Sequence, residues 1–384
     1  MQKLIGLFAF TVLLPRLLGG VPVDGLCILS PKDGASVPIL NDGQRAFLSS
    51  TTKEITDKLW SSEEGLRLAA LGDKPLPVTF AWADTEPTEK AIYRITIGAR
   101  PAMGKDDSFV VTNLTSVRLT NFESDRDYAW SVERLERGKT SVCRATFKTS
   151  NDLPRFLNIP GVRNYRDFGG RVGRDGRRIR QGRIFRSAEL NEGARQNGGS
   201  LFDASFEVGK NLITATGAQE LRETFDIRTD LDIRSDKECA GMTKSPIGGD
   251  VRWVHIPVRA YEYLDNDHAA LAQIFRVFTE EANYPITFHC AAGRDRAGSI
   301  ATILGGLLGE SEEDLYRDWA ASALVKGGAT PDWYDGLIKM LNSYSGKTLN
   351  DRIEAFVRAC GITSAEIERF RELMLEPHSS TLQE

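Results

Sequence analysis

The pattern of hydrophobic and polar positions divides the 384-residue chain into two regions with different periodicity. From residue 21 to residue 150, short segments alternate apolar and polar side chains, which predicts β-strands that cover one face of a core. Residues 44–71 do not fit this strand pattern and suggest an inserted helical segment. Regular short strands predict an all-β sandwich domain; the candidate strands are 26–29, 37–40, 78–82, 91–97, 109–111, 116–120, 128–133 and 142–148, with a hairpin at Gly138.

Beyond a linker at 151–154 the pattern changes to an alternation of strands and helices. This alternation predicts a three-layer α/β domain over residues 154–376, with its site at the carboxyl ends of the strands. Strands are expected at 182–185, 227–233, 251–257 and from 285, and helices at 218–225, 271–281 and 299–308. The end of the chain is predicted to be helical, at 312–323, 331–344, 349–359 and 364–375.

The first twenty residues read as a secretory signal peptide. Lys3 precedes an apolar run over 4–14, and Gly19-Gly20 offers a cleavage site. The run is too short to span a bilayer comfortably, so we expect a secreted or periplasmic protein without a membrane span after cleavage. The formal net charge of −4 and the pI near 5.8 argue against a nucleic-acid partner. The sequence carries no signal for an oligomeric state.

The cysteines favour no metal site. Cys27 and Cys143 fall in the first and last expected strands of the sandwich, which can lie side by side. A disulfide could therefore form between these two cysteines in an oxidising compartment. Cys239 and Cys360 read as buried thiols of the second domain. Because no Cys-x-x-Cys pair or histidine cluster occurs, we expect neither a metal nor a cofactor.

Candidate chemistry concentrates where the strand from residue 285 runs into the helix at 299–308. The connection reads His289-Cys290-Ala291-Ala292-Gly293-Arg294-Asp295-Arg296, and residues 290–296 are called the cradle loop below. Backbone N–H groups at a helix start form an anion cradle, and Gly293 lets the backbone turn without a Cβ clash. Arg296 offers a two-pronged fork for phosphate oxygens. These groups should lower the pKa of Cys290 and prepare its thiolate to attack phosphorus, while His289 is expected to fix the loop by hydrogen bonds.

These residues resemble the signature loop of the cysteine-dependent phosphatases, which include protein tyrosine, dual-specificity and phosphoinositide phosphatases. The Arg294-Asp295-Arg296 version is most similar to atypical bacterial tyrosine phosphatases that resemble lipid phosphatases. Segments 164–170, 182–190 and 230–238 resemble further motifs of that family, in family order, so the resemblance covers roughly residues 154–376. In the first domain, the Trp82 strand, the Tyr93 strand and residues 127–132 resemble a fibronectin type III-like module with Tyr128 as its corner tyrosine.

The resemblance implies a tyrosine-phosphatase-like three-layer domain whose extra C-terminal helices pack over the active-site side. It implies that Cys290 forms a phosphocysteine intermediate and that the loop holds the phosphate. The implied substrate is a phosphorylated protein, phosphotyrosine above all, or a small phosphomonoester; a phosphoinositide or inositol phosphate is the alternative, which the extra cation of Arg294 would suit. The implied phosphate-binding residues are Ala291, Ala292, Gly293, Arg294 and Arg296.

The general acid departs from the family pattern. Tyrosine phosphatases carry an Asp on a loop after an earlier strand, where this chain has Arg259 or Ala260. A carboxylic acid eases departure of the leaving oxygen. We take Asp295 as the candidate, and the nearby acids Glu262, Asp265 and Asp267 stay open as substitutes.

A second departure is Ala297, where the family has a Thr or Ser whose hydroxyl helps the cysteine leave. Its absence predicts slow hydrolysis of the phosphocysteine and keeps open a weakly active, phosphate-binding pseudophosphatase. A sulfurtransferase of the rhodanese type fits less well, because its loop is usually shorter and lacks the closing Arg.

The motif residues Arg166, Asp167, Asp232 and Arg234 are expected near the site, as scaffold salt bridges at least as readily as substrate contacts.

Overall fold

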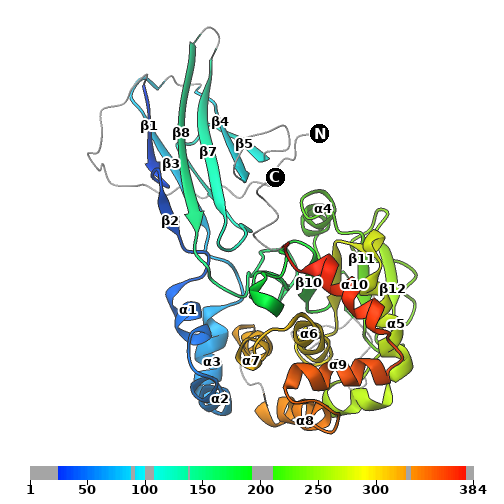
Figure 1. The fold of residues 1–384 in the computed structure, drawn as a ribbon. Helices are drawn as coiled ribbons and strands as arrows, with labels where there is room; N and C mark the ends of the chain where they lie inside the picture. The colour runs from blue at the N-terminus through cyan, green and yellow to red at the C-terminus, as the bar shows by residue number, and fades with distance from the viewer. Residues whose placement is uncertain are drawn as a thin grey trace. The chain divides into compact units, whose positions relative to one another are not determined.

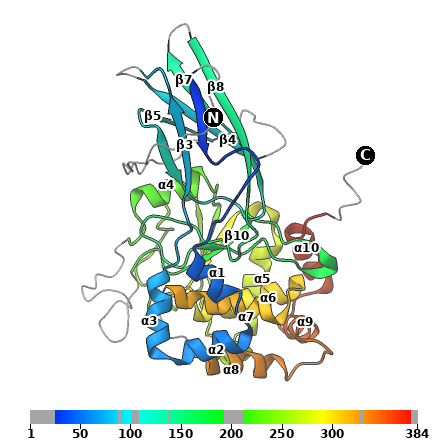
Figure 2. The same ribbon diagram turned by 90° about the vertical axis from the view of Figure 1, so that its left-hand side faces the viewer.

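The computed structural model describes residues 25–87, 91–99, 108–136, 139–192, 211–325 and 330–377. The predicted signal peptide and the hairpin at Gly138 lie outside these residues. The chain divides into two compact units (Figures 1 and 2). One unit contains residues up to Asn41 and Pro75–Asp152, and the other contains Asp42–Lys74 and the chain from Leu153 onward.

The first unit consists of two β-sheets that share one core. Phe80 and Trp82 from one sheet pack in the same cluster as Ile95, Trp130 and Phe147 from the other. Such two-layer packing follows from strands that bury one face only. The three-stranded sheet has the order β1 (Leu26–Ser30), β3 (Val78–Asp84), β6 (Ser116–Leu119), and the five-stranded sheet β2 (Ala35–Val37), β8 (Lys139–Thr149), β7 (Asp127–Glu136), β4 (Tyr93–Ala99), β5 (Ser108–Thr112).

Two sequence predictions on this unit can be compared with its side-chain contacts. The Tyr128 hydroxyl accepts a hydrogen bond from Glu123 N at 2.9 Å, which is the kind of contact that a corner tyrosine makes. No disulfide joins Cys27 and Cys143, and Cys143 Sγ lies 3.0 Å from the carbonyl oxygen of Leu26 instead. The disulfide left open from the strand positions is therefore not formed in the structure.

The second unit is built on a five-stranded sheet in the order β12 (Arg252–His255), β11 (Thr229–Asp232), β13 (Ile286–His289), β10 (Ile184–Ser187), β9 (Arg166–Asp167). The first four strands run parallel and β9 is antiparallel. Helix α4 (Ala215–Glu223) lies on one side of this sheet, and α5 (His268–Thr279) and α6 (Asp295–Leu308) lie on the other (Figure 1). The mixed α/β fold expected from the alternating pattern is confirmed.

The C-terminal helices extend the layer of α5 and α6. Helices α9 (Leu349–Ala359) and α10 (Ser364–Met374) pack against α5 and α6, and α7 (Glu312–Ala320) packs against α6. Helix α8 (Pro331–Leu341) lies against the turn η2 (Tyr261–Asn266), which follows β12. Among the described C-terminal helices, α7, the short helix η4 (Ala321–Leu324) that continues it, and α8 supply side chains to the site. Within the described residues, no helix is both long and apolar enough to cross a bilayer.

Residues 42–74 belong with the second unit, although they interrupt the sequence of the first. They form α1 (Asp42–Leu48), α2 (Thr52–Trp60) and α3 (Ser62–Leu71), and a capping box at Thr51 and a cap at Ser61 start the last two. Helix α2 packs against α7, and α3 packs against η4. The boundary of 21–150 is corrected here, because the apolar side chains of these helices are buried on the helical unit: Ile55, Leu59 and Leu68.

The parallel strands bring their last residues to one edge. Ser187 of β10 pairs with His289 of β13, which pairs with Asp232 of β11. The chain leaves β13 at Cys290 and enters α6 at Asp295, four residues before the predicted start. Asp295 in the first turn complements the positive end of the helix dipole, which favours this earlier start.

Candidate active site

The cradle loop lies between the end of a central strand and the start of a buried helix. Cys290 directly follows β13 and is only 1% exposed. Gly293 has a φ of +68°, and a Cβ at this position would lie 2.5 Å from the carbonyl carbon and oxygen of Ser187. Only glycine fits this close approach of two backbones.

Groups outside the cradle loop bind three consecutive carbonyl oxygens of the loop. Glu189 N donates to Ala291 O at 3.2 Å, Asn164 Nδ2 donates to Ala292 O at 3.1 Å, and Arg186 Nη2 donates to Gly293 O at 2.7 Å. In a trans peptide the C=O and N–H groups point in opposite directions. The N–H groups of residues 292–294 are therefore directed to the other side, where they can bind an anion together with the helix N-terminus.

Arg296 extends from the first turn of α6 and forms a two-point ion pair with Glu238. Arg296 Nη1 lies 2.6 Å from Oε2, and Nη2 lies 2.8 Å from Oε1. Burial would raise the pKa of Glu238, but Arg296 and Ser235 outweigh it and lower this pKa to about 2. Burial would likewise lower the pKa of Arg296, but Glu238 and Cys290 hold it above its usual value. The guanidinium group of Arg296 is thus charged and oriented by Glu238.

A buried cluster of arginines around Asp318 supports the loop from behind. Asp318 Oδ1 lies 3.1 Å from Arg166 Nε and 3.3 Å from Arg171 Nη2, and Asp318 Oδ2 pairs with Arg186 Nη1. Burial would raise the pKa of Asp318, yet the three guanidinium groups hold it well below its usual range. Arg166 is fully buried in this cluster, so it is a scaffold residue and does not face a substrate.

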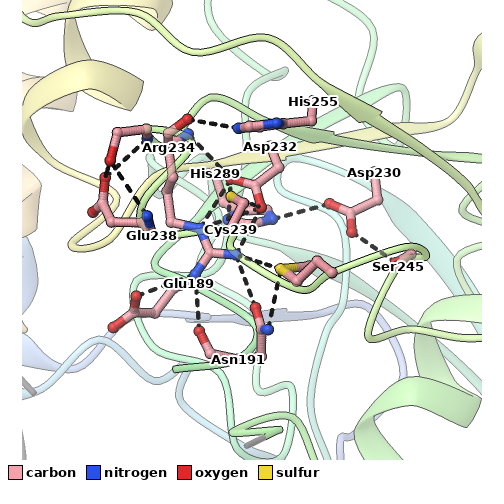
Figure 3. A network of polar contacts seen from close by, with 12 residues as sticks. Glu189, Asn191, Asp230, Asp232, Arg234, Glu238, Cys239, Ser245, His255 and His289 are labelled. Atoms are coloured by element: carbon pink, nitrogen blue, oxygen red, sulfur yellow. Dashed lines mark hydrogen bonds and ion pairs between the residues drawn. The ribbon is translucent and has the colours of Figure 1, made fainter. Parts of the chain in front are cut away.

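The Asp232–Arg234 pair is also part of the scaffold. Figure 3 shows it within a network of polar contacts. Arg234 Nε and Nη2 lie 2.9 Å and 2.7 Å from the two Asp232 oxygens, and Nη2 also donates to Asn191 Oδ1 at 2.8 Å. Both members of the pair are fully buried, so neither is available to contact a substrate.

His289 is held by strand β11. Its Nε2 lies 3.1 Å from Asp230 Oδ1, and its Nδ1 lies 3.9 Å from Asp232 Oδ1 (Figure 3). Burial would lower the pKa of His289, but Asp232 and Asp230 outweigh burial and raise it. The predicted role is corrected here: the side chain of His289 fixes the strand that carries Cys290 and does not bind the loop itself.

Asp167, the last motif residue, holds the chain around β9. Its Oδ2 accepts hydrogen bonds from Arg155 Nη1 and from Gly182 N, both at 2.7 Å. Its Oδ1 accepts one from Gly169 N at 2.8 Å. Asp167 is fully buried, so it has a structural role.

Among the acid candidates, Asp295 alone belongs to the cradle loop. Its Oδ1 accepts hydrogen bonds from the Tyr261 hydroxyl at 2.5 Å and from Arg294 Nε at 3.2 Å. Burial and then Asp295 raise the pKa of Tyr261, so this phenol stays protonated and donates. Tyr261 N in turn donates to Ser299 Oγ at 3.0 Å, which connects the turn after β12 to α6.

The other three acids bind groups elsewhere. Asp267 pairs with Arg259, whose Nη2 lies 2.6 Å from Oδ1. Asp265 accepts a hydrogen bond from the Tyr344 hydroxyl and lies 3.3 Å from His268 Nε2. Glu262 packs on α8, where a Cβ added at Gly336 would lie 2.6 Å from its Oε2.

Position 297 is fully buried and carries no hydroxyl. The next hydroxyl along α6 belongs to Ser299, which donates to Asp295 O at 2.9 Å and accepts from Tyr261 N. Ser299 therefore serves the turn after β12 and does not replace the Thr or Ser of the family pattern.

Arg294 and Trp333 lie together beside the loop. The guanidinium carbon of Arg294 lies 5.8 Å from the centroid of the Trp333 ring, at a distance that permits a cation–π contact. Trp333, near the start of α8, is 47% exposed. In the described part of the chain, no group of three or more His, Cys, Asp or Glu side chains could hold a metal ion.

The chain resembles known phosphatases over the region that builds this site. A model of a tyrosine phosphatase family matches residues 157–206 and 209–376. A provisionally named tyrosine-protein phosphatase of Cupriavidus necator is 26% identical over 197 residues, which cover 43% of this chain and 62% of that protein. The chain thus spans less than two thirds of this relative. The family model, however, matches more than half of this chain and includes the cradle loop and its supports, so the chain belongs to the tyrosine phosphatase family.

Proposed function

We propose that this protein is a cysteine-dependent phosphatase that hydrolyses phosphate monoesters through a phosphocysteine intermediate. One observation carries the proposal: the carbonyl groups of Ala291, Ala292 and Gly293 are bound from outside the loop. This arrangement directs N–H groups into a cradle that begins at Cys290 and closes at Arg296. A cradle of N–H dipoles and one fixed cation stabilises the charge of a transferring phosphoryl group.

The chemistry proceeds in two steps. In the first, the Cys290 thiolate attacks phosphorus, the S–P bond forms and the P–O bond to the leaving group breaks, while Asp295 gives a proton to the leaving oxygen. In the second, water attacks the phosphocysteine, Asp295 takes up a proton from the water, and the S–P bond breaks. Inorganic phosphate leaves, and Cys290 returns to the thiolate.

Phosphotyrosine is the substrate class that the surroundings of the loop favour. Trp333 exposes an aromatic surface close to Arg294 of the loop, and an aryl ring attached to the bound phosphate would pack on such a surface. Trp333→Ala should therefore lower kcat/KM for a phosphotyrosine peptide several-fold more than for a phosphoserine peptide of the same sequence. Equal losses on both peptides would argue against an aromatic wall, and activity on phosphoinositides alone would favour the lipid alternative.

The absence of a hydroxyl at position 297 is the specific feature that favours a second candidate function. Ala297 supplies no hydroxyl, and Ser299 is engaged elsewhere. A protein that forms phosphocysteine quickly and hydrolyses it very slowly would act as a phosphate-binding module. A burst of product equal to the amount of protein, followed by almost no turnover, would support this alternative.

Export is part of the proposal and rests on residues 1–20. The charged start, apolar run and glycine pair have the order of a signal peptide. Expression of the full chain with periplasmic fractionation, followed by N-terminal sequencing, tests it. Cleavage near Gly20 is expected, and an intact N-terminus in the cytoplasm would contradict export.

Hydrolysis of p-nitrophenyl phosphate tests the phosphatase itself. The wild type and Cys290→Ser are compared under reducing conditions with EDTA present, and both are shown to be folded by circular dichroism. Cys239→Ser serves as the matched control, because Cys239 is buried and its Sγ lies 3.3 Å from Asp232 in the scaffold. Activity that disappears in Cys290→Ser and survives in Cys239→Ser is expected. Activity that survives in Cys290→Ser would exclude the cysteine mechanism.

A further inference from the structure

The helices over residues 42–74 lie outside the region that matches the family model, which begins at residue 157. They nevertheless pack on the elements that support the cradle loop. Helix α3 contacts η4, and α2 contacts α7; Thr56 Oγ1 lies 2.7 Å from the Tyr316 hydroxyl of α7. Helix α7 carries Asp318, and η4 carries Ser322.

Asp73, just after α3, makes a direct contact with the scaffold of the loop. Its Oδ2 accepts a short hydrogen bond from Asn164 N, and its residue is 7% exposed. The backbone on both sides of Asp73 is fixed, because Gln44 Nε2 donates to Gly72 O at 2.9 Å and to Lys74 O at 3.1 Å. Asp73 is therefore held in place to bind this N–H group.

Asn164 carries the contact on to the loop. It has a φ of +55°, a left-handed conformation that is uncommon outside glycine and that surrounding contacts must hold. Its Nδ2 donates to Ala292 O at 3.1 Å and to Ser322 Oγ at 3.2 Å, and its Oδ1 accepts from Arg166. Both the backbone and the side chain of Asn164 must be in place for Ala292 O to stay outside the cradle.

We propose that Asp73 is a positioning residue for the phosphate-binding loop, which makes the inserted helices 42–74 a working part of the active site. Asp73 holds Asn164, and Asn164 holds the Ala292 carbonyl outward so that Gly293 N–H faces the phosphate. Without Asp73 this peptide can turn, and a carbonyl oxygen would then face the bound anion. The inference rests on the proposed function only in taking phosphate as the ligand of the loop.

The test measures phosphate binding without turnover. In the full chain carrying Cys290→Ser, the affinity for inorganic phosphate is measured by calorimetry with and without Asp73→Ala and Asp73→Asn. Loss of a hydrogen bond to a charged group should weaken phosphate binding about tenfold in Asp73→Ala. Asp73→Asn keeps an oxygen that accepts from Asn164 N and should stay within about threefold of the parent. Asp73→Asn as weak as Asp73→Ala, or unchanged affinity in Asp73→Ala, would overturn the proposal.

Hydrogen exchange provides a readout that does not depend on phosphate. Amide exchange in a peptide that covers residues 290–296 should become faster in Asp73→Ala and stay near that of the parent in Asp73→Asn. Asp57→Asn is the matched control, because it breaks an exposed ion pair with Lys53 on helix α2 without touching Asp73; it should leave exchange and phosphate affinity unchanged. Unchanged loop exchange in a folded Asp73→Ala protein would overturn the positioning role even if phosphate binding changed.

A double-mutant cycle separates the positioning role from a general loss of stability. Asn164→Ala alone should weaken phosphate binding, and adding Asp73→Ala to it should cost little more, because the two residues act on one carbonyl. Additive losses would contradict the proposal. Absent phosphate binding in the parent, with loop exchange that still responds to Asp73, would leave the positioning role and remove the proposed function.

Discussion

The Tyr261 hydroxyl lies 2.5 Å from Asp295 Oδ1 and donates a hydrogen bond to it. Arg294 donates to the same oxygen, so among the described contacts Oδ2 is the oxygen left to carry a proton. Tyr261 has a φ of +59°, which is strained for a bulky residue. Ser299 Oγ holds its backbone N–H and Trp319 Nε1 donates to its hydroxyl at 3.4 Å. The strained turn thus presents one phenol to one carboxylate.

Tyr261→Phe should affect the protonation step more than phosphate binding. Without the phenol, Asp295 loses the stronger of its two donors and can rotate, so kcat should fall about tenfold for substrates with poor leaving groups. The fall should be small for p-nitrophenyl phosphate, whose leaving group needs little protonation. A series of aryl phosphates of increasing phenol basicity measures this dependence.

Tyr263→Phe is the control for this change, because it removes a hydroxyl from the same turn at an exposed position. Its rates should match the wild type across the series. A uniform loss of rate in Tyr261→Phe, independent of the leaving group, would contradict a role in orienting the acid.

Glu238→Gln should loosen Arg296 and remove an acid-dependent part of the stability. The pKa of Glu238 is lowered from its ordinary value of 4.5 to about 2 in the folded protein. A carboxylate whose pKa is lower in the folded than in the unfolded protein stabilises the folded state at pH values above its unfolded pKa. For Glu238 this contribution is lost as the pH falls from about 4.5 towards 2. At pH 7 we expect a loss of about 1–3 kcal/mol for this partly buried two-point pair.

Urea unfolding of both proteins between pH 7 and pH 3 measures this difference. It should shrink as the pH falls below 4.5, and KM should rise at neutral pH because Arg296 is less well oriented. A difference in stability that stays constant down to pH 3 would show that the loss in Glu238→Gln does not come from the ion pair.

Asp318→Asn should destabilise the second unit strongly. Asp318 pairs with Arg166, Arg186 and Arg171, and its removal leaves buried guanidinium groups with less compensating charge. Breaking such a buried network costs about 3–5 kcal/mol. Because the pKa of Asp318 is held well below its usual range, the loss should be the same from pH 8 down to pH 5.

Asp314→Asn, on the same helix, is the control. Asp314 pairs with Arg317 at 3.4 Å near the surface, so its loss should cost less than about 1 kcal/mol. Denaturant unfolding of the two variants compares them. Equal losses would show that the Asp318 cluster is not a special source of stability.

The local parts of this structure could be predicted from the sequence. The strand before Cys290 and the helix after it follow from apolar runs, and Gly293 marks the tight turn, so the elements on both sides of the cradle loop were predicted correctly. Helices α7–α10 begin within one residue of their predicted starts, because capping residues and amphipathic periods are local signals. The roles assigned to the loop residues remain predictions.

The supports of the loop could not be predicted in the same way. Asn164 and Arg186 fall within segments that resemble family motifs, but the sequence does not reveal their contacts or those of Asp73 and Asp318, because the partners are distant in sequence. Asp318 offered one signal, since a buried carboxylate interrupts the apolar side of α7. The helices 42–74 were recognised as different from the sandwich, but no periodicity tells which unit will bury their apolar face.

Ala297→Thr should speed the breakdown of the phosphocysteine. The hydroxyl would lie directly after Arg296 and could donate a hydrogen bond to the departing Cys290 sulfur. We expect this hydrogen bond to speed hydrolysis of the phosphocysteine about tenfold. Position 297 is fully buried, so the larger side chain will also cost about 1–3 kcal/mol of stability through overpacking.

Ala297→Val has the same shape without the hydroxyl and separates the two effects. In rapid-mixing experiments with p-nitrophenyl phosphate, Ala297→Thr should raise the steady rate after the burst, and Ala297→Val should not. Equal rates in the two variants would show that the missing hydroxyl at position 297 does not limit turnover.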